Sequence, residues 1–175
     1  TSGEPGSESS SASATISATG GTLSKTSITG NNQTLTWKIG ENTDAARSFT
    51  ATIKSNDNSS TTDSITASQN AVELIIDRMN DHLLTYEAQT QNITAECTRN
   101  GSAYAPTVTS NQTWATVGTI TNSGTTYNIP VTVTANTSET SSRTAELTIK
   151  LSSGSVNKTA TTSITQAKYV QPREH

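Results

Sequence analysis

LTWKIGENTDAARSFTATIK (residues 35–54) aligns without a gap on VTVTANTSETSSRTAELTIK (residues 131–150), at an offset of 96 residues. In this alignment Arg47 meets Arg143, and both copies end on Thr-Ile-Lys. One residue later in register, the runs ITASQ and TSITQ close the two copies on matching glutamines. Because self-similarity at a fixed spacing is typical of repeated structural units, we expect two related units in this chain of 175 residues.

Both copies show the alternation of half-buried strands. Apolar residues occupy every second position of two successive runs in each copy, with polar residues between them. Since successive side chains of a strand point to opposite faces, one face of each run is apolar. Two such runs around a polar turn predict a hairpin whose apolar faces pack together. The expected core residues are Trp37, Phe49, Ile53, Trp114, Val133, Leu147 and Ile149.

The composition favours strands along the whole chain. It contains 36 Thr, 25 Ser and 14 Asn. Thr suits the pleated surface of a sheet, whereas Asn and Ser favour turns. A net charge of -3 is too small to indicate disorder throughout. The predicted fold class is therefore all-β, with two β-sandwich domains in tandem.

The charge pattern and the lengths of apolar runs exclude two kinds of partner. Acidic residues number 14 against 11 basic ones, without a basic cluster, so attraction to nucleic acid is not expected. The longest apolar run, at residues 74–76, is far short of the roughly 20 residues of a membrane-spanning helix, and no signal peptide is present. Because the chain begins with Thr1, we expect a processed or trimmed product. Cys97 is the single cysteine and leaves the redox compartment open.

The second copy resembles the BACON domain. The resemblance is carried by Trp114-Ala115-Thr116-Val117, the VTVTAN strand (residues 131–136), the SRTAELTIK strand (residues 142–150) and the terminal SITQ (residues 163–166). LLTYEAQTQNITAE (residues 83–96) is similar to the opening hairpin of that family, so the resemblance covers most of residues 83–167. It implies an immunoglobulin-like β-sandwich on the surface of Bacteroidetes or on phages that infect them.

Composition and resemblance together divide the chain into five segments. Residues 1–13 contain no apolar residue larger than Ala or Pro and predict a flexible tether. Residues 14–70 form the first, short immunoglobulin-like domain, residues 85–167 the second, BACON-like one, and residues 168–175 a tail. Residues 71–84 are expected to be a connector. Their apolar spacing fits either a strand or a short helix, and the resemblance favours the strand.

The first copy lacks elements that the second contains. Upstream of Leu35 it has only ATISATGGTLSKTSITGNNQ, enough for one or two strands, without an opening hairpin or a counterpart of Trp114. A sandwich that lacks strands exposes a sheet edge and a core face, which invites pairing with another chain. Three sources of the missing strand remain open: the tether, residues 71–84 or a neighbouring subunit.

The sequence contains no recognised set of catalytic or metal-binding residues. His82, together with Asp77, Asp81 and the distant Cys97, does not form a known zinc or iron set. SNDNSSTTD (residues 55–63) offers the oxygen atoms that calcium prefers but lacks the Gly and Glu of the calcium loop. A G-x-S-x-G motif is also missing. We therefore expect a protein that is not an enzyme and needs no cofactor and no metal.

Two tyrosines are candidates for ligand contact. Sugar sites place exposed aromatic rings against pyranose rings, and this chain has 2 Trp, 4 Tyr and 1 Phe. The two tryptophans are expected in the cores. Tyr104, in GSAYAP, and Tyr127, in SGTTYN, lie in or beside predicted turns and are the candidates for an exposed contact.

These observations favour a non-catalytic structural or adhesive subunit that assembles through β-strand pairing. It would be displayed on a bacterial surface or phage virion, as a capsid decoration, fibre or filament. Its expected partners are other copies of itself or other virion or surface proteins. The alternative is a carbohydrate-binding accessory module for glycans or mucin. Both readings imply an extracellular, cell-surface or virion location.

Overall fold

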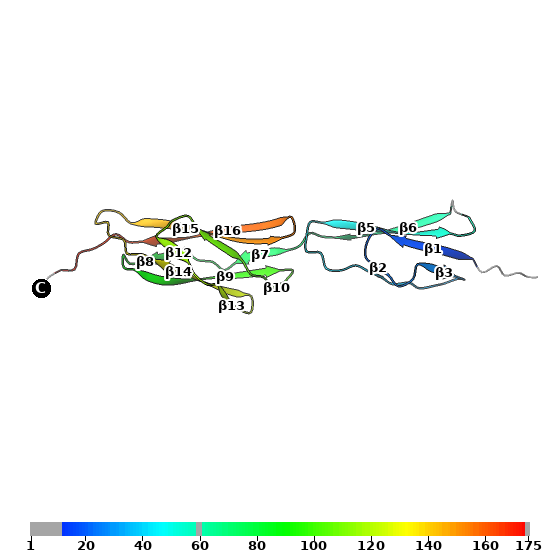
Figure 1. Cartoon of the computed structure of the whole chain (residues 1–175), viewed down its shortest axis with the longest axis horizontal. Coiled ribbons are helices and arrows are strands. Elements are labelled where there is room, and N and C mark those ends of the chain that lie inside the picture. Colours follow the sequence, from blue (N-terminus) through cyan, green and yellow to red (C-terminus); the bar gives the residue numbers. More distant parts are fainter. Residues whose placement is uncertain (1–11, 59–60, 174–175) are drawn as a thin grey trace, which may run out of the picture. The chain divides into compact units, whose positions relative to one another are not determined.

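The computed structural model describes residues 12–58 and 61–173. All regular secondary structure within these ranges is β-strand (Figure 1), which confirms the all-β prediction. No helix of this part of the chain is long and apolar enough to span a membrane. The chain divides into two compact units, as the repeat predicts. Unit 1 comprises Thr1–Asn42 and Ala46–Ala71, and unit 2 comprises Thr43–Ala45 and Val72–His175.

Unit 2 is a sandwich of two sheets. One sheet has the order β10 (Ser102–Ala103), β9 (Gln89–Arg99), β14 (Thr126–Val133) and β12 (Ala115–Val117), with β7 (Leu74–Asp77) beside β9 and β13 (Thr121–Ser123) beside β14. The other has the order β11 (Thr107–Ser110), β15 (Arg143–Ser153), β16 (Val156–Gln166) and β8 (His82–Leu84). Strand β8 runs parallel with β16. The inward side chains of both sheets form one closed core that includes Ile93, Ile129, Val131, Val133, Leu147, Ile149, Leu151 and Ile164.

Unit 1 has one larger and one very small sheet. The larger sheet has the order β3 (Ser27–Thr29), β1 (Ser13–Ala18), β5 (Arg47–Ser55) and β6 (Thr62–Gln69). The small one pairs β2 (Thr22–Leu23) with β4 (Trp37–Lys38). Of the described apolar residues of unit 1, only Ile16 and Ala51 are buried. Two strands of two residues each are too short to cover a four-stranded sheet, so one of its faces stays open.

The last two strands of each unit are joined by the same arginine–glutamine hydrogen bond. In unit 1, Arg47 Nε donates to Gln69 Oε1 at 2.7 Å, and the two residues face each other across the β5–β6 ladder. In unit 2, Arg143 Nε donates to Gln166 Oε1 at 2.8 Å across the β15–β16 ladder. Strand β5 is therefore the counterpart of β15, and β6 is the counterpart of β16.

The strand before this pair is also shared. Thr50 N donates to Thr19 Oγ1 at 2.9 Å in unit 1, and Glu146 N donates to Asn111 Oδ1 at 2.8 Å in unit 2. Each contact lies at the end of the strand that flanks β5 or β15, so β1 is the counterpart of β11.

The small sheet of unit 1 completes the comparison. Leu23 pairs with Trp37 in unit 1, and Ala115 pairs with Val133, the counterpart of Trp37, in unit 2. The β2–β4 pair therefore corresponds to the pairing of β12 with the end of β14. The described residues of unit 1 contain no counterpart of β7, β8 or β9. The described part of the first copy is thus incomplete at its leading end, because its first strand corresponds to β11.

The predicted hairpins are wrong. Strands β14 and β15 belong to different sheets, so their apolar faces meet across the core instead of lying side by side. Residues 83–96, expected as an opening hairpin, contain most of β8 and β9, which also belong to different sheets. Alternation shows which side of a strand faces inward, but it does not select the neighbour in the sheet.

Residues 71–84 are not a separate connector, because Ala71 ends unit 1 and residues 72–84 belong to unit 2. They include β7 and β8 and form the predicted strands, without a helix. Val72 and Leu74 are buried and Ile75 is 39% exposed, which is strand alternation.

The two ends of the chain also differ from the predicted tether and tail. Residues 1–11 of the predicted tether lie outside the described ranges. Its last two residues are structured, because Ser13 begins β1 and Ala12 O accepts a hydrogen bond from Gly30 N at 2.9 Å. In the predicted tail, Tyr169 N donates to Ser138 O at 2.8 Å and the Tyr169 ring packs edge-on against Tyr86.

Candidate functional site

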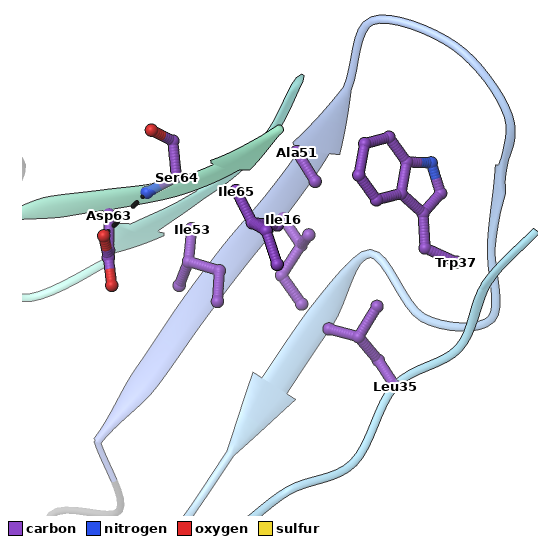
Figure 2. Close-up of a pocket in the computed structure, with 8 residues that line it drawn as sticks. All are labelled: Ile16, Leu35, Trp37, Ala51, Ile53, Asp63, Ser64 and Ile65. Atoms are coloured by element: carbon purple, nitrogen blue, oxygen red, sulfur yellow. Dashed lines mark hydrogen bonds between the residues drawn. The ribbon is translucent and has the colours of Figure 1, made fainter. Parts of the chain in front are cut away.

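An open apolar pocket lies on the uncovered face of the unit 1 sheet. Its volume is about 350 Å³. Figure 2 shows the isoleucines of β1, β5 and β6 gathered on one side of the sheet, with Leu35 and Trp37 across from them. The lining residues are Ile16, Leu35, Trp37, Ala51, Ile53, Asp63, Ser64 and Ile65. A second pocket, of about 260 Å³, shares Ile53 and Asp63 with the first.

The pocket exposes side chains that a complete sandwich would cover. Ile65 is 66% exposed and Ile53 is 39% exposed. Ile149, the counterpart of Ile53 in unit 2, is fully buried. The prediction that Ile53 is a core residue is therefore wrong. The reason is that the residues of unit 1 that the structure describes contain no counterpart of β9, so no strand of a second sheet extends over this part of β5.

Among the residues that the structure describes, Asp63 is the one charged residue lining the larger pocket. Its Oδ1 accepts a hydrogen bond from Ser64 N at 2.9 Å. The bond from Ser55 N to Thr61 O, 3.0 Å long, sets the alternation of the β5–β6 ladder. In that alternation the amide of Ser64 points away from β5, toward the free side of β6. The carboxylate thus covers one position of an exposed sheet edge.

Trp37 and Phe49 lie at the margin of unit 1 and not in a closed core. Both side chains are half-buried. Trp37 Nε1 donates to Gly20 O at 2.9 Å, which fixes the ring at the pocket. The Arg47 guanidinium lies 5.1 Å from the centre of the Phe49 ring. A Cβ on Gly20 would overlap this ring, so a side chain there would displace it.

The structure places the predicted core residues of unit 2 at two depths. Val133, Leu147 and Ile149 are at most 1% exposed. Trp114 is half-buried and packs against the edge of the core, with the Arg143 guanidinium 4.2 Å from its ring centre. Trp114 therefore closes the core beside the hydrogen bond between Arg143 and Gln166.

Neither predicted contact tyrosine offers a free ring. Tyr127 is 6% exposed, and the expectation of an exposed contact there is wrong. The turn before it occupies residues 124–125, so Tyr127 is already the second residue of β14 and its side chain is buried. This burial raises the pKa of Tyr127. Tyr104 is half-buried. Its hydroxyl donates to Ser152 O at 2.6 Å and the Arg99 guanidinium lies 4.4 Å from its ring centre. The carbohydrate alternative therefore gains no support from either side chain.

The residues considered for metal binding have structural partners. The described part of the chain contains no group of three or more His, Cys, Asp or Glu residues arranged to hold a metal ion. Asp81 Oδ1 accepts hydrogen bonds from Ser163 N at 3.0 Å and from Thr162 Oγ1 at 3.3 Å. These contacts, that from Ser163 above all, lower the pKa of Asp81. Asp81 therefore helps to attach the β8 segment to β16.

Cys97 is expected to be chemically inert in the folded chain. Its side chain is fully buried in β9, and burial, with the nearby charge of Glu96, raises the pKa of the thiol to about 11. Since the thiolate is the reactive form, this lowers its population about a hundredfold relative to an ordinary cysteine. Iodoacetamide should label Cys97 only after urea has unfolded unit 2. Rapid labelling of the native chain at mildly alkaline pH would contradict this burial.

Residues 103–167 match the model of the BACON family, described as "Putative binding domain, N-terminal". The match begins in β10 and ends just after β16, so it lies within unit 2. It confirms the predicted resemblance over a shorter range than residues 83–167.

Two solved structures are similar to the chain at low identity. The first is a chimeric titin Z1Z2 functionalized with a KLER exogenous peptide from decorin, with 14% identity and a TM-score of 0.34, covering 88% of this chain and 73% of that one. The second contains zebrafish RET cadherin-like domains 1 to 4, with 10% identity and a TM-score of 0.40, covering 89% of this chain and 41% of that one. This chain thus spans less than half of the RET structure. No curated protein sequence matches the chain.

Proposed function

We propose that this protein is a non-catalytic binding or adhesive module that assembles through the open face of unit 1. It acts as a structural subunit outside the cell, on a bacterial surface or a phage virion, and its partners are other copies or other proteins of the same assembly. One observation carries the proposal: the apolar pocket on an uncovered sheet, with Ile65 66% exposed. The family match in unit 2, to a domain described as binding, supports the same class of function.

Burial of the open face provides the driving force for assembly. Fully burying an isoleucine side chain stabilises a complex by about 1.5 to 3 kcal/mol. Ile53 and Ile65 stand beside each other at the pocket, and the rest of β6 exposes mainly Thr and Ser. Apolar patches with a polar rim are typical of protein interaction sites. The pocket therefore has the character of an unfilled interface.

Replacing Ile65 with Thr should weaken association of the full chain without unfolding it. The change removes apolar surface from the exposed face, and we expect about a tenfold loss of association, the equivalent of part of one buried isoleucine. Sedimentation velocity over a range of concentrations measures the effect. Leu83→Thr is the matched control, because Leu83 is 85% exposed on β8 of unit 2 and should leave association unchanged.

Hydrogen exchange supplies the result that would overturn the proposal. An open unit 1 should exchange the amides of β5 faster than unit 2 exchanges those of β15, because its core is smaller. A chain that stays monomeric at every concentration, with β5 protected as strongly as β15, would show that unit 1 needs no partner.

A further inference from the structure

In unit 2 the last strand, β16, has a parallel neighbour, β8. The described part of unit 1 contains the counterpart of β16, which is β6, but no counterpart of β8. Strand β8 lies parallel with β16, with His82 opposite Ile164 and Leu84 opposite Gln166. Ala167 N donates to Leu84 O at 2.9 Å, immediately after this pairing. The outer side of β16 is thus occupied by a parallel strand.

The counterpart of this outer side is open in unit 1. Strand β6 ends its sheet, and within the described residues no strand pairs with its outer side. The alternation set by the Ser55–Thr61 bond turns the amides of Ser64, Thr66 and Ser68 outward. Asp63 covers the amide of Ser64, which leaves the amides of Thr66 and Ser68 on the exposed edge. Thr66 is the counterpart of Ser163, whose amide donates to the carboxylate of Asp81, the residue just before β8.

The matching glutamines, Gln166 and Gln69, also differ in the number of acceptors around their side-chain amides. Gln166 Nε2 lies within hydrogen-bond distance of three carbonyl oxygens, at 3.1 Å from Tyr86 O, 3.1 Å from Glu87 O and 3.0 Å from Thr134 O. Two of these acceptors follow directly after β8. Gln69 Nε2 donates to Gly40 O at 2.8 Å. The acceptors that unit 2 supplies after β8 therefore have no counterpart in the described part of unit 1.

The residues on the pocket side of β6 indicate which side chains an added strand at this edge would need. Asp63, Ile65, Ala67 and Gln69 lie on one face of β6, by strand alternation. Residues 1–13 contain no apolar residue larger than Ala or Pro, so they do not match an apolar pocket. Asp63 is exposed and lines the pocket, so its carboxylate favours a basic side chain at the position of an added segment that faces it.

We infer that β6 binds an extended segment of a separate polypeptide, added parallel to β6 in the register of β8 on β16. This inference rests on the proposed function and specifies its partner. The segment has a basic side chain opposite Asp63 and apolar side chains opposite Ile65, Ala67 and Gln69. Its backbone pairs with the outward amides of Thr66 and Ser68, and its apolar side chains extend the apolar face beside Ile65. Addition of the segment supplies the counterpart of β8, one of the strands without a counterpart in the described part of unit 1.

The test uses the full chain and a synthetic peptide with this pattern, Arg-Thr-Ile-Thr-Val-Thr-Leu-Thr, capped at both ends. Binding should slow amide hydrogen exchange at Thr66 and Ser68. Thr66→Pro removes one outward amide from an edge strand that tolerates proline there, so peptide affinity should fall about fivefold or more. Thr66→Ala is the matched control, because it keeps the amide and should bind like the parent chain. A peptide with Glu in place of Arg should bind more weakly.

The outcomes separate this inference from the proposed function. Equal peptide binding by Thr66→Pro and Thr66→Ala would overturn strand addition at β6. A spin label on the peptide N-terminus should broaden signals near Asp63, and broadening near Gln69 would overturn the parallel orientation. Protection of Thr66 by rising protein concentration alone would identify a second copy as the occupant and overturn a separate polypeptide.

If Ile65→Thr weakens association and Thr66→Pro does not, the proposed function stands and the strand inference fails. If neither variant changes association or peptide binding, both fail.

Discussion

Replacing Leu147 with Ala is expected to lower the free energy of unfolding of unit 2 by about 2 to 5 kcal/mol. Leu147 is fully buried in β15, and the opposing sheet of the sandwich covers its side chain. The substitution removes apolar contacts and leaves a cavity that rigid strands fill only in part. Since domains are stable by about 5 to 15 kcal/mol, unit 2 would lose a large share of its stability.

Urea unfolding, followed by the NMR signals of unit 2 residues, measures this loss. Leu83→Ala is the control, because its side chain is 85% exposed and the change should stay within about 0.5 kcal/mol. Equal effects of the two substitutions would contradict the closed core of unit 2.

Replacing Gln166 with Leu is expected to destabilise unit 2 by about 3 to 6 kcal/mol, although the volumes are similar. The Gln166 side chain is fully buried, its Nε2 faces three carbonyl oxygens, and its Oε1 accepts from Arg143 Nε. Leucine would leave these groups without their partner, and an unsatisfied buried group costs about 1 to 3 kcal/mol. Burial lowers the pKa of Arg143, and the substitution would remove the acceptor of its Nε.

Gln69→Leu is the matched substitution in unit 1. Gln69 is half-buried, and its Nε2 donates to one carbonyl oxygen, that of Gly40. Its loss should therefore be clearly smaller than that of Gln166→Leu, as measured by hydrogen exchange of β5 and β15. A similar loss in both units would mean that the glutamine acts only through its bond to the arginine.

Alternation in the sequence was sufficient to predict strands and the direction in which their side chains point. Leu147 and Ile149 in unit 2 have the predicted inward orientation. The duplication was also indicated by the matching arginines, Arg47 and Arg143, and by the two closing glutamines. In the structure the arginine and the glutamine of each unit form the same hydrogen bond. The count of one or two strands before Leu35 was too low, because β1, β2 and β3 all precede that residue.

Strand partners and actual exposure required the folded chain. The sequence pattern is the same whether two neighbouring strands pair in one sheet or face each other across a core, so β14 and β15 were wrongly predicted as a hairpin. Ile53 and Ile149 occupy matching positions, yet only Ile149 is covered, because coverage depends on strands distant in sequence. Tyr127 was wrongly expected to be exposed because its position beside a turn does not determine which side of β14 its side chain occupies. Periodicity is a local property of the chain, whereas burial and pairing are set by segments that meet only on folding.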